Sequence, residues 1–107
     1  MSLKIAQQEV ENWIQEVGIR YFNELTNMSL LMEEVGELAR IIARKYGEQS
    51  SKPGDDPGNL GDELADVLFV LLCLANQTGV DLESSFQQNL EKKYLRDKDR
   101  HRNNPKL

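Results

Sequence analysis

The sequence predicts an all-α fold, and three observations carry that prediction. Apolar residues recur at helical spacing in four segments, and none of these shows the strict alternation of a β-strand. Glycine, proline or a capping residue marks the boundaries of the segments. The chain of 107 residues has the length of one domain, without low-complexity blocks or a linker to a second domain. We therefore expect a single domain over residues 1–107, folded as an oligomeric, four-helix bundle-like structure.

The first two helices have recognisable start and stop signals. The first is expected at about 3–18, with Ser2 as its N-cap. The second is expected at about 25–46, where Gly47 supplies the stop. Gly36 interrupts the second helix at a cost of about 1 kcal/mol relative to alanine. This glycine suggests that a neighbouring helix approaches the backbone there.

The second half of the chain continues the pattern after a loop. Residues 48–59 hold two Pro-Gly steps and no large apolar side chain, which predicts a flexible loop. The third helix is expected at about 60–78, capped by Asn59 and ended by Gly79. A fourth helix is expected at about 81–101, before a polar tail.

The third helix carries a run of apolar residues, from Val67 to Ala75, that leaves it no polar face. Such a helix is expected to be buried on all sides, and a subunit interface would complete the burial. Cys73 lies in this run and is the single cysteine, so it should be a small buried side chain in a reducing cytoplasm. The run is far shorter than the roughly 20 residues that span a bilayer, so we expect a cytoplasmic protein without a membrane partner.

Two acidic motifs stand out because the second repeats the first 29 positions later. They read Glu-Glu-Val-Gly-Glu at 33–37 and Asp-Glu-Leu-Ala-Asp at 62–66. Each motif places two carboxylates three residues apart, and residues at that spacing share one face of a helix. The paired residues are Glu34 with Glu37, and Glu63 with Asp66.

The surroundings of these acids are unusually apolar. Glu34 lies between Leu38 and Ile41 on the helical wheel, and nine apolar residues follow Asp66. An unpaired buried carboxylate would take up a proton or destabilise the fold. If the two helices pack antiparallel, the four acids converge into an oxygen cluster that suits Mg²⁺ or Mn²⁺ better than zinc. Glu33 projects about 100° away and could lie at the surface or hold a water bound to the metal.

A plainer interpretation exists for each part of this pattern. A single Glu-x-x-Glu pair is most often a solvated helix face, although two such pairs on two apolar helices are harder to explain that way. Trp13 is most simply a core anchor, and it could instead line a nucleobase pocket. The net charge of −5 argues against nucleic-acid binding. Residues 91–107 are nevertheless basic, which fits either a solvated helix end or a contact with an anionic, metal-bound substrate.

Several catalytic classes are improbable. The only histidine, His101, lies in the polar tail, so a Ser-His or Cys-His nucleophile is not expected. Neither a phosphate-binding Gly-x-x-x-x-Gly-Lys loop nor a dinucleotide-binding Gly-x-Gly-x-x-Gly motif occurs. Metal-assisted chemistry on an anion remains, and four carboxylates would suit two or more ions once a polyphosphate is bound.

The paired motifs resemble the Glu-Glu-x-x-Glu and Glu-x-x-Asp signature of the MazG-like nucleoside triphosphate pyrophosphohydrolases. The resemblance covers nearly the whole domain and is greatest for the short single-domain members. It implies Mg²⁺-dependent hydrolysis between the α and β phosphates of a nucleotide, to give a nucleoside monophosphate and pyrophosphate. In the cell, such an enzyme would remove aberrant or surplus nucleotides.

The resemblance also implies roles for individual residues. The magnesium ligands would be Glu34, Glu37, Glu63 and Asp66. Glu33 would orient or deprotonate the attacking water. Phosphate contacts would come from Arg96 and from Lys92 or Lys93.

A different class of function stays open at this point. The chain could be a non-catalytic helical module that uses its apolar third helix for oligomerisation or for binding another protein. Its acids would then hold a structural ion. Both interpretations expect assembly, and we expect a homodimer or homotetramer.

Overall fold

The computed structural model describes residues 1–54 and 58–107, and every regular element in those ranges is helical. The elements are α1 (Leu3–Trp13), a π-helical turn η1 (Ile14–Gly18), α2 (Glu24–Tyr46), α3 (Leu60–Thr78) and α4 (Leu82–Asp97). The predicted all-α class is therefore confirmed. Residues 48–54 and 58–59 contain no helix or strand, as expected, and the remaining positions of the predicted loop, 55–57, lie outside the described residues.

The helix starts follow from side-chain caps. Ser2, Asn59 and Asp81 each accept a hydrogen bond from the backbone N–H three residues later, at 3.1, 3.0 and 3.3 Å. These caps satisfy N–H groups that have no partner inside a helix. Asn23 does the same for α2, which therefore begins at Glu24 rather than at the predicted position 25.

The predicted end of the fourth helix, at 101, is wrong, because α4 ends at Asp97. The Asp97 carboxylate accepts hydrogen bonds from the guanidinium groups of Arg96 and Arg100. The backbone N–H of Arg100 donates to the Asp97 carbonyl at 3.2 Å, a turn rather than a continued α-helix. Residues 96–106 hold no large apolar side chain, so packing cannot stabilise a longer helix there.

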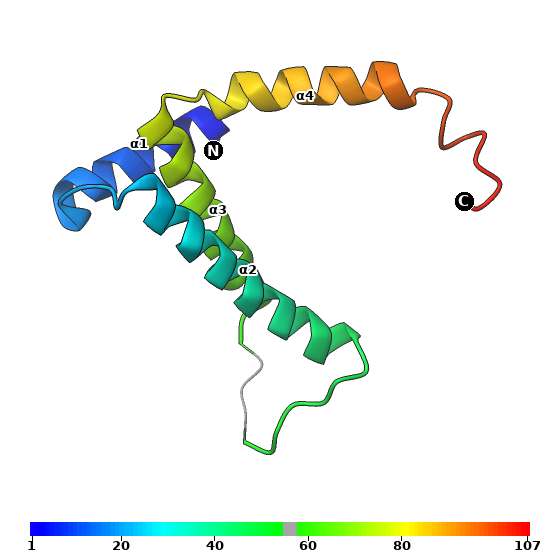
Figure 1. The fold of residues 1–107 in the computed structure, drawn as a ribbon, viewed down its shortest axis with the longest axis horizontal. Coiled ribbons are helices and arrows are strands. Elements are labelled where there is room, and N and C mark those ends of the chain that lie inside the picture. Colours follow the sequence, from blue (N-terminus) through cyan, green and yellow to red (C-terminus); the bar gives the residue numbers. More distant parts are fainter. Residues whose placement is uncertain (55–57) are drawn as a thin grey trace.

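The helices α2 and α3 run antiparallel side by side, as Figure 1 shows. The start of α2 meets the end of α3, where Asn27 hydrogen-bonds Gln77. The end of α2 meets the chain just before α3, where the Ile41 side chain lies against Gly58. This pairing brings the two acidic motifs to the same level.

The core lies mainly between α1 and α3. Val10 and Ile14 pack there against Leu72 and Cys73. The predicted burial of Cys73 is confirmed, and this burial raises the pKa of its thiol to about 11. Tyr21 flanks the cluster, and its hydroxyl donates to the Glu11 carboxylate.

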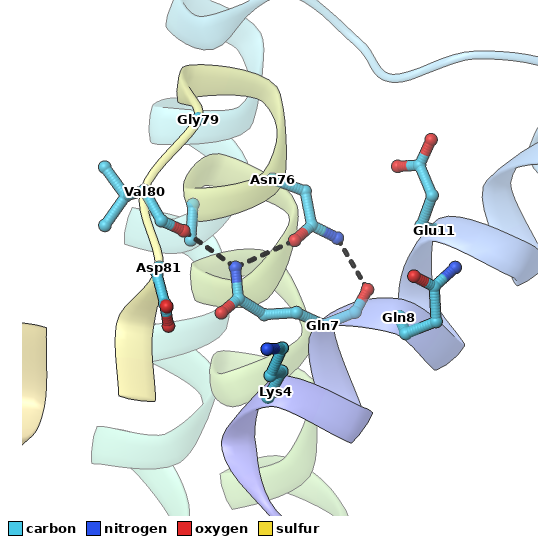
Figure 2. A pocket seen from close by; sticks show the side chains of 9 residues that line it. Lys4, Gln7, Gln8, Glu11, Asn76, Gly79, Val80 and Asp81 are labelled. Atoms are coloured by element: carbon cyan, nitrogen blue, oxygen red, sulfur yellow. Dashed lines mark hydrogen bonds between the residues drawn. The ribbon is translucent and has the colours of Figure 1, made fainter. Parts of the chain in front are cut away.

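The corner between α3 and α4 is held by the side chain of Gln7 from α1, as Figure 2 shows. The Gln7 amide nitrogen donates to the Asn76 side chain at 2.9 Å and to the Val80 carbonyl at 2.8 Å. The Gln7 amide oxygen accepts from the backbone N–H of Leu82, the first residue of α4, at 3.0 Å. Gln7 therefore ties the corner between α3 and α4 to α1.

Within one chain, α4 does not complete a bundle with the other three helices. It extends away from α2 and α3, and the angle between α3 and α4 is 106° (Figure 1). The radius of gyration is 17.7 Å, whereas a compact domain of this size has about 13 Å. No single helix in the described ranges is long and apolar enough to cross a bilayer, and α3 with α4 meets that criterion only as a bent pair.

The apolar run of α3 is not buried on all sides within the single chain, because Leu68 and Leu71 remain exposed. Leu68 and Leu71 line a groove together with Leu82 and Phe86 of α4. The subunit interface expected to complete its burial stays a prediction. The expected approach of a neighbouring helix to Gly36 is wrong within the described part of the chain, since a Cβ added there would meet nothing within 4 Å.

Candidate functional site

Three of the predicted metal ligands meet between α2 and α3. Glu34 and Glu37 come from one face of α2, and Glu63 comes from the first turn of α3. One carboxylate oxygen of each lies within 4.8 Å of the other two. Glu34 and Glu63 are half-buried, whereas Glu37 is exposed at the rim.

Two oxygens in this cluster have no partner. Glu34 Oε2 and Glu63 Oε2 are sealed from solvent, and no described group hydrogen-bonds either of them. A buried polar atom without a partner is costly. The donor set contains only carboxylate oxygens, the ligands that a hard divalent cation such as Mg²⁺ prefers. The residues present therefore fit such an ion.

The electrostatics of the cluster agree with this fit. Burial is the largest factor that raises the pKa of Glu34, and the charges of Asp66 and Glu37 add to it. Burial also raises the pKa of Glu63, to which nearby Glu37 and Asp66 contribute. The fold thus holds negative charge where it is unfavourable, and a bound cation would relieve both causes.

The structure places the remaining predicted acids beside the cluster. Asp66 is half-buried one turn after Glu63, outside the group of three, and its charge acts on Glu34 and Glu63. Glu33 is exposed next to Glu34, and its charge also raises the pKa of Glu34. The proposed roles of these two acids stay predictions.

Trp13 lies at a small apolar pocket. Trp13 is 46% exposed, and its ring meets Phe69 edge-to-face with the ring centroids 5.5 Å apart. The same ring lies so close to Gly18 that a Cβ there would be 3.1 Å from Trp13 Cζ3. Together with Leu30 and Cys73, these residues line a cavity of about 170 Å³. Trp13 is thus both a packing residue and part of a cavity wall.

This pocket lies next to the carboxylates along both helices. Leu30 lines it and precedes Glu34 by four residues, and Val70 lines it and follows Asp66 by four. Four residues on a helix are about one turn. A ligand could therefore place a flat ring in the pocket and an anionic group at the acids.

Sequence reasoning missed Asn27, which also lines the pocket. Its side chain is only 4% exposed, the single buried polar residue in the described ranges. A signal was present, because Asn27 occupies the position that continues the apolar stripe of Leu30, Leu31 and Leu38 toward the start of α2. Gln77, its partner on α3, gave no such signal.

The predicted phosphate contacts are not brought to the acids within one chain. Lys92, Lys93 and Arg96 are exposed on α4, whose main packing partner is α1. Lys93 Nζ donates to the Asn89 side chain at 2.6 Å, and Arg96 Nη2 donates to Asp97 at 2.8 Å. The open pocket in Figure 2 contains none of the predicted site residues.

Similar proteins identify the family. Residues 22–101 match the MazG nucleotide pyrophosphohydrolase domain. The Bacillus subtilis (strain 168) protein YpjD is 41% identical over 99 residues, which cover 92% of this chain and 89% of YpjD. YvdC from the same strain is 30% identical over 98 residues, covering 86% of this chain and 92% of YvdC.

Two crystal structures share the fold. That of Bacillus subtilis YpjD has a TM-score of 0.77 and 38% identity, covering 86% of this chain and 92% of that one. That of the Bacillus-conserved MazG protein, a nucleotide pyrophosphohydrolase, has a TM-score of 0.71 and 36% identity, covering 86% and 88%. With its carboxylate cluster and all-helical fold, the chain belongs to the MazG nucleotide pyrophosphohydrolase family.

Proposed function

We propose that this protein is a Mg²⁺-dependent nucleotide pyrophosphohydrolase that splits a nucleoside or deoxynucleoside triphosphate between its α and β phosphates. The products would be a nucleoside monophosphate and pyrophosphate, and the use would be disposal of aberrant or surplus nucleotides. The observation that carries the proposal is the trio of Glu34, Glu37 and Glu63, two of whose oxygens are buried without a partner. Family membership supports the class of reaction.

The cation would be held by the trio, with Asp66 next to it. Mg²⁺, or Mn²⁺ in its place, would neutralise charge on the phosphates and make a water molecule more acidic. Glu33 is exposed beside Glu34. Its carboxylate would be the base that accepts a proton from the attacking water. The pocket beside Trp13 would hold the base, because aromatic walls favour a flat ring.

The basic residues of α4 enter the proposal through assembly. Lys92, Lys93 and Arg96 lie on α4, which extends away from α2 and α3 of its own chain (Figure 1). In a homodimer or homotetramer, the α4 of a second copy could bring these cations to the polyphosphate. Charge-assisted contacts of this kind would hold the leaving pyrophosphate.

The experiment incubates purified protein and Mg²⁺ with a panel of nucleoside triphosphates and measures released pyrophosphate. Glu34→Gln should lower turnover by at least about a hundredfold, because it removes a buried ligand charge while leaving the side-chain shape unchanged. Glu9→Gln is the matched control, since Glu9 is exposed on α1, outside the trio. It should retain the activity of the unchanged protein.

Two outcomes would contradict the proposal. No pyrophosphate release from any nucleotide in the panel, modified ones included, would favour the non-catalytic module. Equal activity of Glu34→Gln and the unchanged protein would remove the trio from the mechanism. Circular dichroism of each variant checks that the helical content is retained.

A further inference from the structure

The pocket beside Trp13 contains one polar group that packing does not explain. Asn27 is 4% exposed among apolar and aromatic side chains, although a buried amide is costly unless its donors and acceptor find partners. Two partners are present for its nitrogen. Asn27 Nδ2 donates to the Phe22 carbonyl at 3.3 Å and to Gln77 Oε1 at 2.7 Å.

The orientation of the Asn27 amide is fixed by the backbone carbonyl of Phe22. A carbonyl oxygen only accepts, so the side-chain atoms that face it must be nitrogens. Gln77 Nε2 donates to this carbonyl at 2.8 Å, which leaves Gln77 Oε1 to accept from Asn27. Both hydrogens of Asn27 Nδ2 are therefore used, and Asn27 Oδ1 must point elsewhere.

Asn27 Oδ1 is the group left over. None of the hydrogen bonds of the described residues involves this oxygen, and it is not one of the sealed oxygens, which belong to Glu34 and Glu63. Asn27 Oδ1 therefore keeps some accessible surface, and Asn27 lines the pocket beside Trp13. Arg20 also lines the pocket, but it is exposed, and its guanidinium donates to the Tyr21 carbonyl. The buried part of the pocket thus offers a hydrogen-bond acceptor.

We propose that Asn27 Oδ1 makes this protein selective for nucleotides whose base carries an exocyclic amino group, a 4-aminopyrimidine or a 6-aminopurine. This inference rests on the proposed function, and it adds the class of base. An amino group would donate to Asn27 Oδ1. A keto oxygen at the same position would face a second acceptor and lose its hydrogen bonds to water.

The size of the pocket agrees with this ligand. Its volume of about 170 Å³ is below the roughly 300–1,000 Å³ of pockets that enclose whole drug-sized ligands. It can therefore take a base while the sugar and phosphates remain outside. The acids lie one helical turn away, where the phosphates would be expected.

The test measures binding of nucleoside monophosphates, which need no turnover. Trp13 is the only tryptophan of the chain, so its fluorescence reports on occupation of the pocket that it lines. The matched pairs are dCMP with dUMP and AMP with IMP. Within each pair a keto oxygen replaces the amino group, and the neighbouring ring nitrogen gains a hydrogen. We expect the amino member of at least one pair to bind about tenfold more tightly, and the two pairs distinguish a pyrimidine from a purine site.

Variants separate recognition from folding. Asn27→Leu should bring the amino-to-keto ratio of affinities to about one, because it removes the acceptor. Asn12→Leu is the matched control on the exposed face of α1 and should keep the ratio of the unchanged protein.

Three results would overturn the inference. They are equal binding within both pairs, tighter binding of the keto members, and an unchanged ratio in a folded Asn27→Leu protein. The proposed function has a separate readout, since pyrophosphate release without base preference would leave hydrolysis standing and remove only the role of Asn27. Amino-selective binding without hydrolysis would support the role of Asn27 and remove the proposed hydrolysis.

Discussion

At the scale of single residues, the centre of this molecule is a group of carboxylates held where negative charge is unfavourable. Glu34 and Glu63 each have a buried oxygen without a described partner, and burial raises the pKa of both. Such an arrangement lowers the stability of the metal-free protein. It becomes favourable when a cation supplies the missing contacts, so binding and folding are linked.

This linkage predicts that the metal-free protein loses stability as the pH rises. A carboxyl group with a folded-state pKa above its ordinary value of 4.5 stabilises the fold fully below that pH, and the contribution is lost as the pH rises through the folded-state pKa. With a chelator present, we expect the melting temperature to be lower at about pH 8 than at about pH 5. Added Mg²⁺ should remove most of the difference.

The control for this prediction is Glu63→Gln, which cannot ionise at that position. Its melting temperature should depend less on pH, and Mg²⁺ should stabilise it less than it stabilises the unchanged protein. Asp97 affects stability in the opposite direction with pH. Its hydrogen bond to Arg96 lowers its pKa to about 2, so its contribution to stability is lost only in more acidic solution. A metal-free melting temperature that rises with pH would contradict the argument.

Single residues also show how far the sequence could predict the site. Helical spacing predicted that the acids meet if the two helices pack antiparallel, and Glu34, Glu37 and Glu63 do meet. Asp66 was expected among them and lies outside the group of three. Trp13 could not be assigned to the core or to a nucleobase pocket, since an indole suits both. In the structure it packs against Phe69 and lines a cavity, and its role toward a base stays a prediction. Asn27 was missed because its role depends on Gln77, a contact across 50 positions of sequence.

At the scale of elements, the connection between η1 and α2 is strained. Ile19 has φ 71° and ψ −56°, and the Arg20 N–H donates to the Gly18 carbonyl at 2.8 Å, which makes a tight three-residue γ-turn. A β-branched residue rarely adopts positive φ. Ile19 is 89% exposed, so packing does not offset this strain. The neighbouring residues Gly18 and Arg20 line the Trp13 pocket, which connects this turn to the site.

We predict that Ile19→Gly stabilises the protein by about 1 kcal/mol, since strain of about 1–3 kcal/mol is relieved against a loss of about 0.5–1 kcal/mol from chain entropy. Thermal unfolding measures the change. Val17→Gly is the comparison, because Val17 is also exposed but lies in the helical turn η1, and this change should destabilise. A lower melting temperature for Ile19→Gly would show that the turn is not strained in solution.

The elements were predictable where local signals decide them, and less so where contacts decide them. The caps at Ser2, Asn59 and Asp81 follow from side chains that bond their own backbone, so these boundaries were found. The end of α4 and its direction were not found. The direction depends on Gln7, which reaches from α1 to the first residue of α4, and no helical period records that contact.

At the scale of the whole molecule, the single chain leaves apolar surface uncovered. A groove of about 560 Å³ lies between α3 and α4, lined by Leu68, Leu71, Leu82 and Phe86 among others. Helix α4 has no buried residue. An isolated helix of 16 residues is marginal in water, so α4 needs a partner surface to stay folded. A second copy would provide this surface and would also bring basic residues toward the acids.

The proposed assembly predicts that a charge in the groove separates the copies and stops catalysis together. Light scattering should give the unchanged protein two or four times the chain mass of 12.3 kDa. Leu71→Glu should shift it to a single chain mass, because burying an unpaired carboxylate in an apolar interface is costly. Pyrophosphate release should fall with it, since Lys92, Lys93 and Arg96 would no longer reach the substrate of a second copy.

Leu25→Glu, at an 82% exposed position outside the groove, should change neither property. A Leu71→Glu protein that is monomeric yet fully active would show that one chain holds the complete site, and the basic residues of α4 would then need another role.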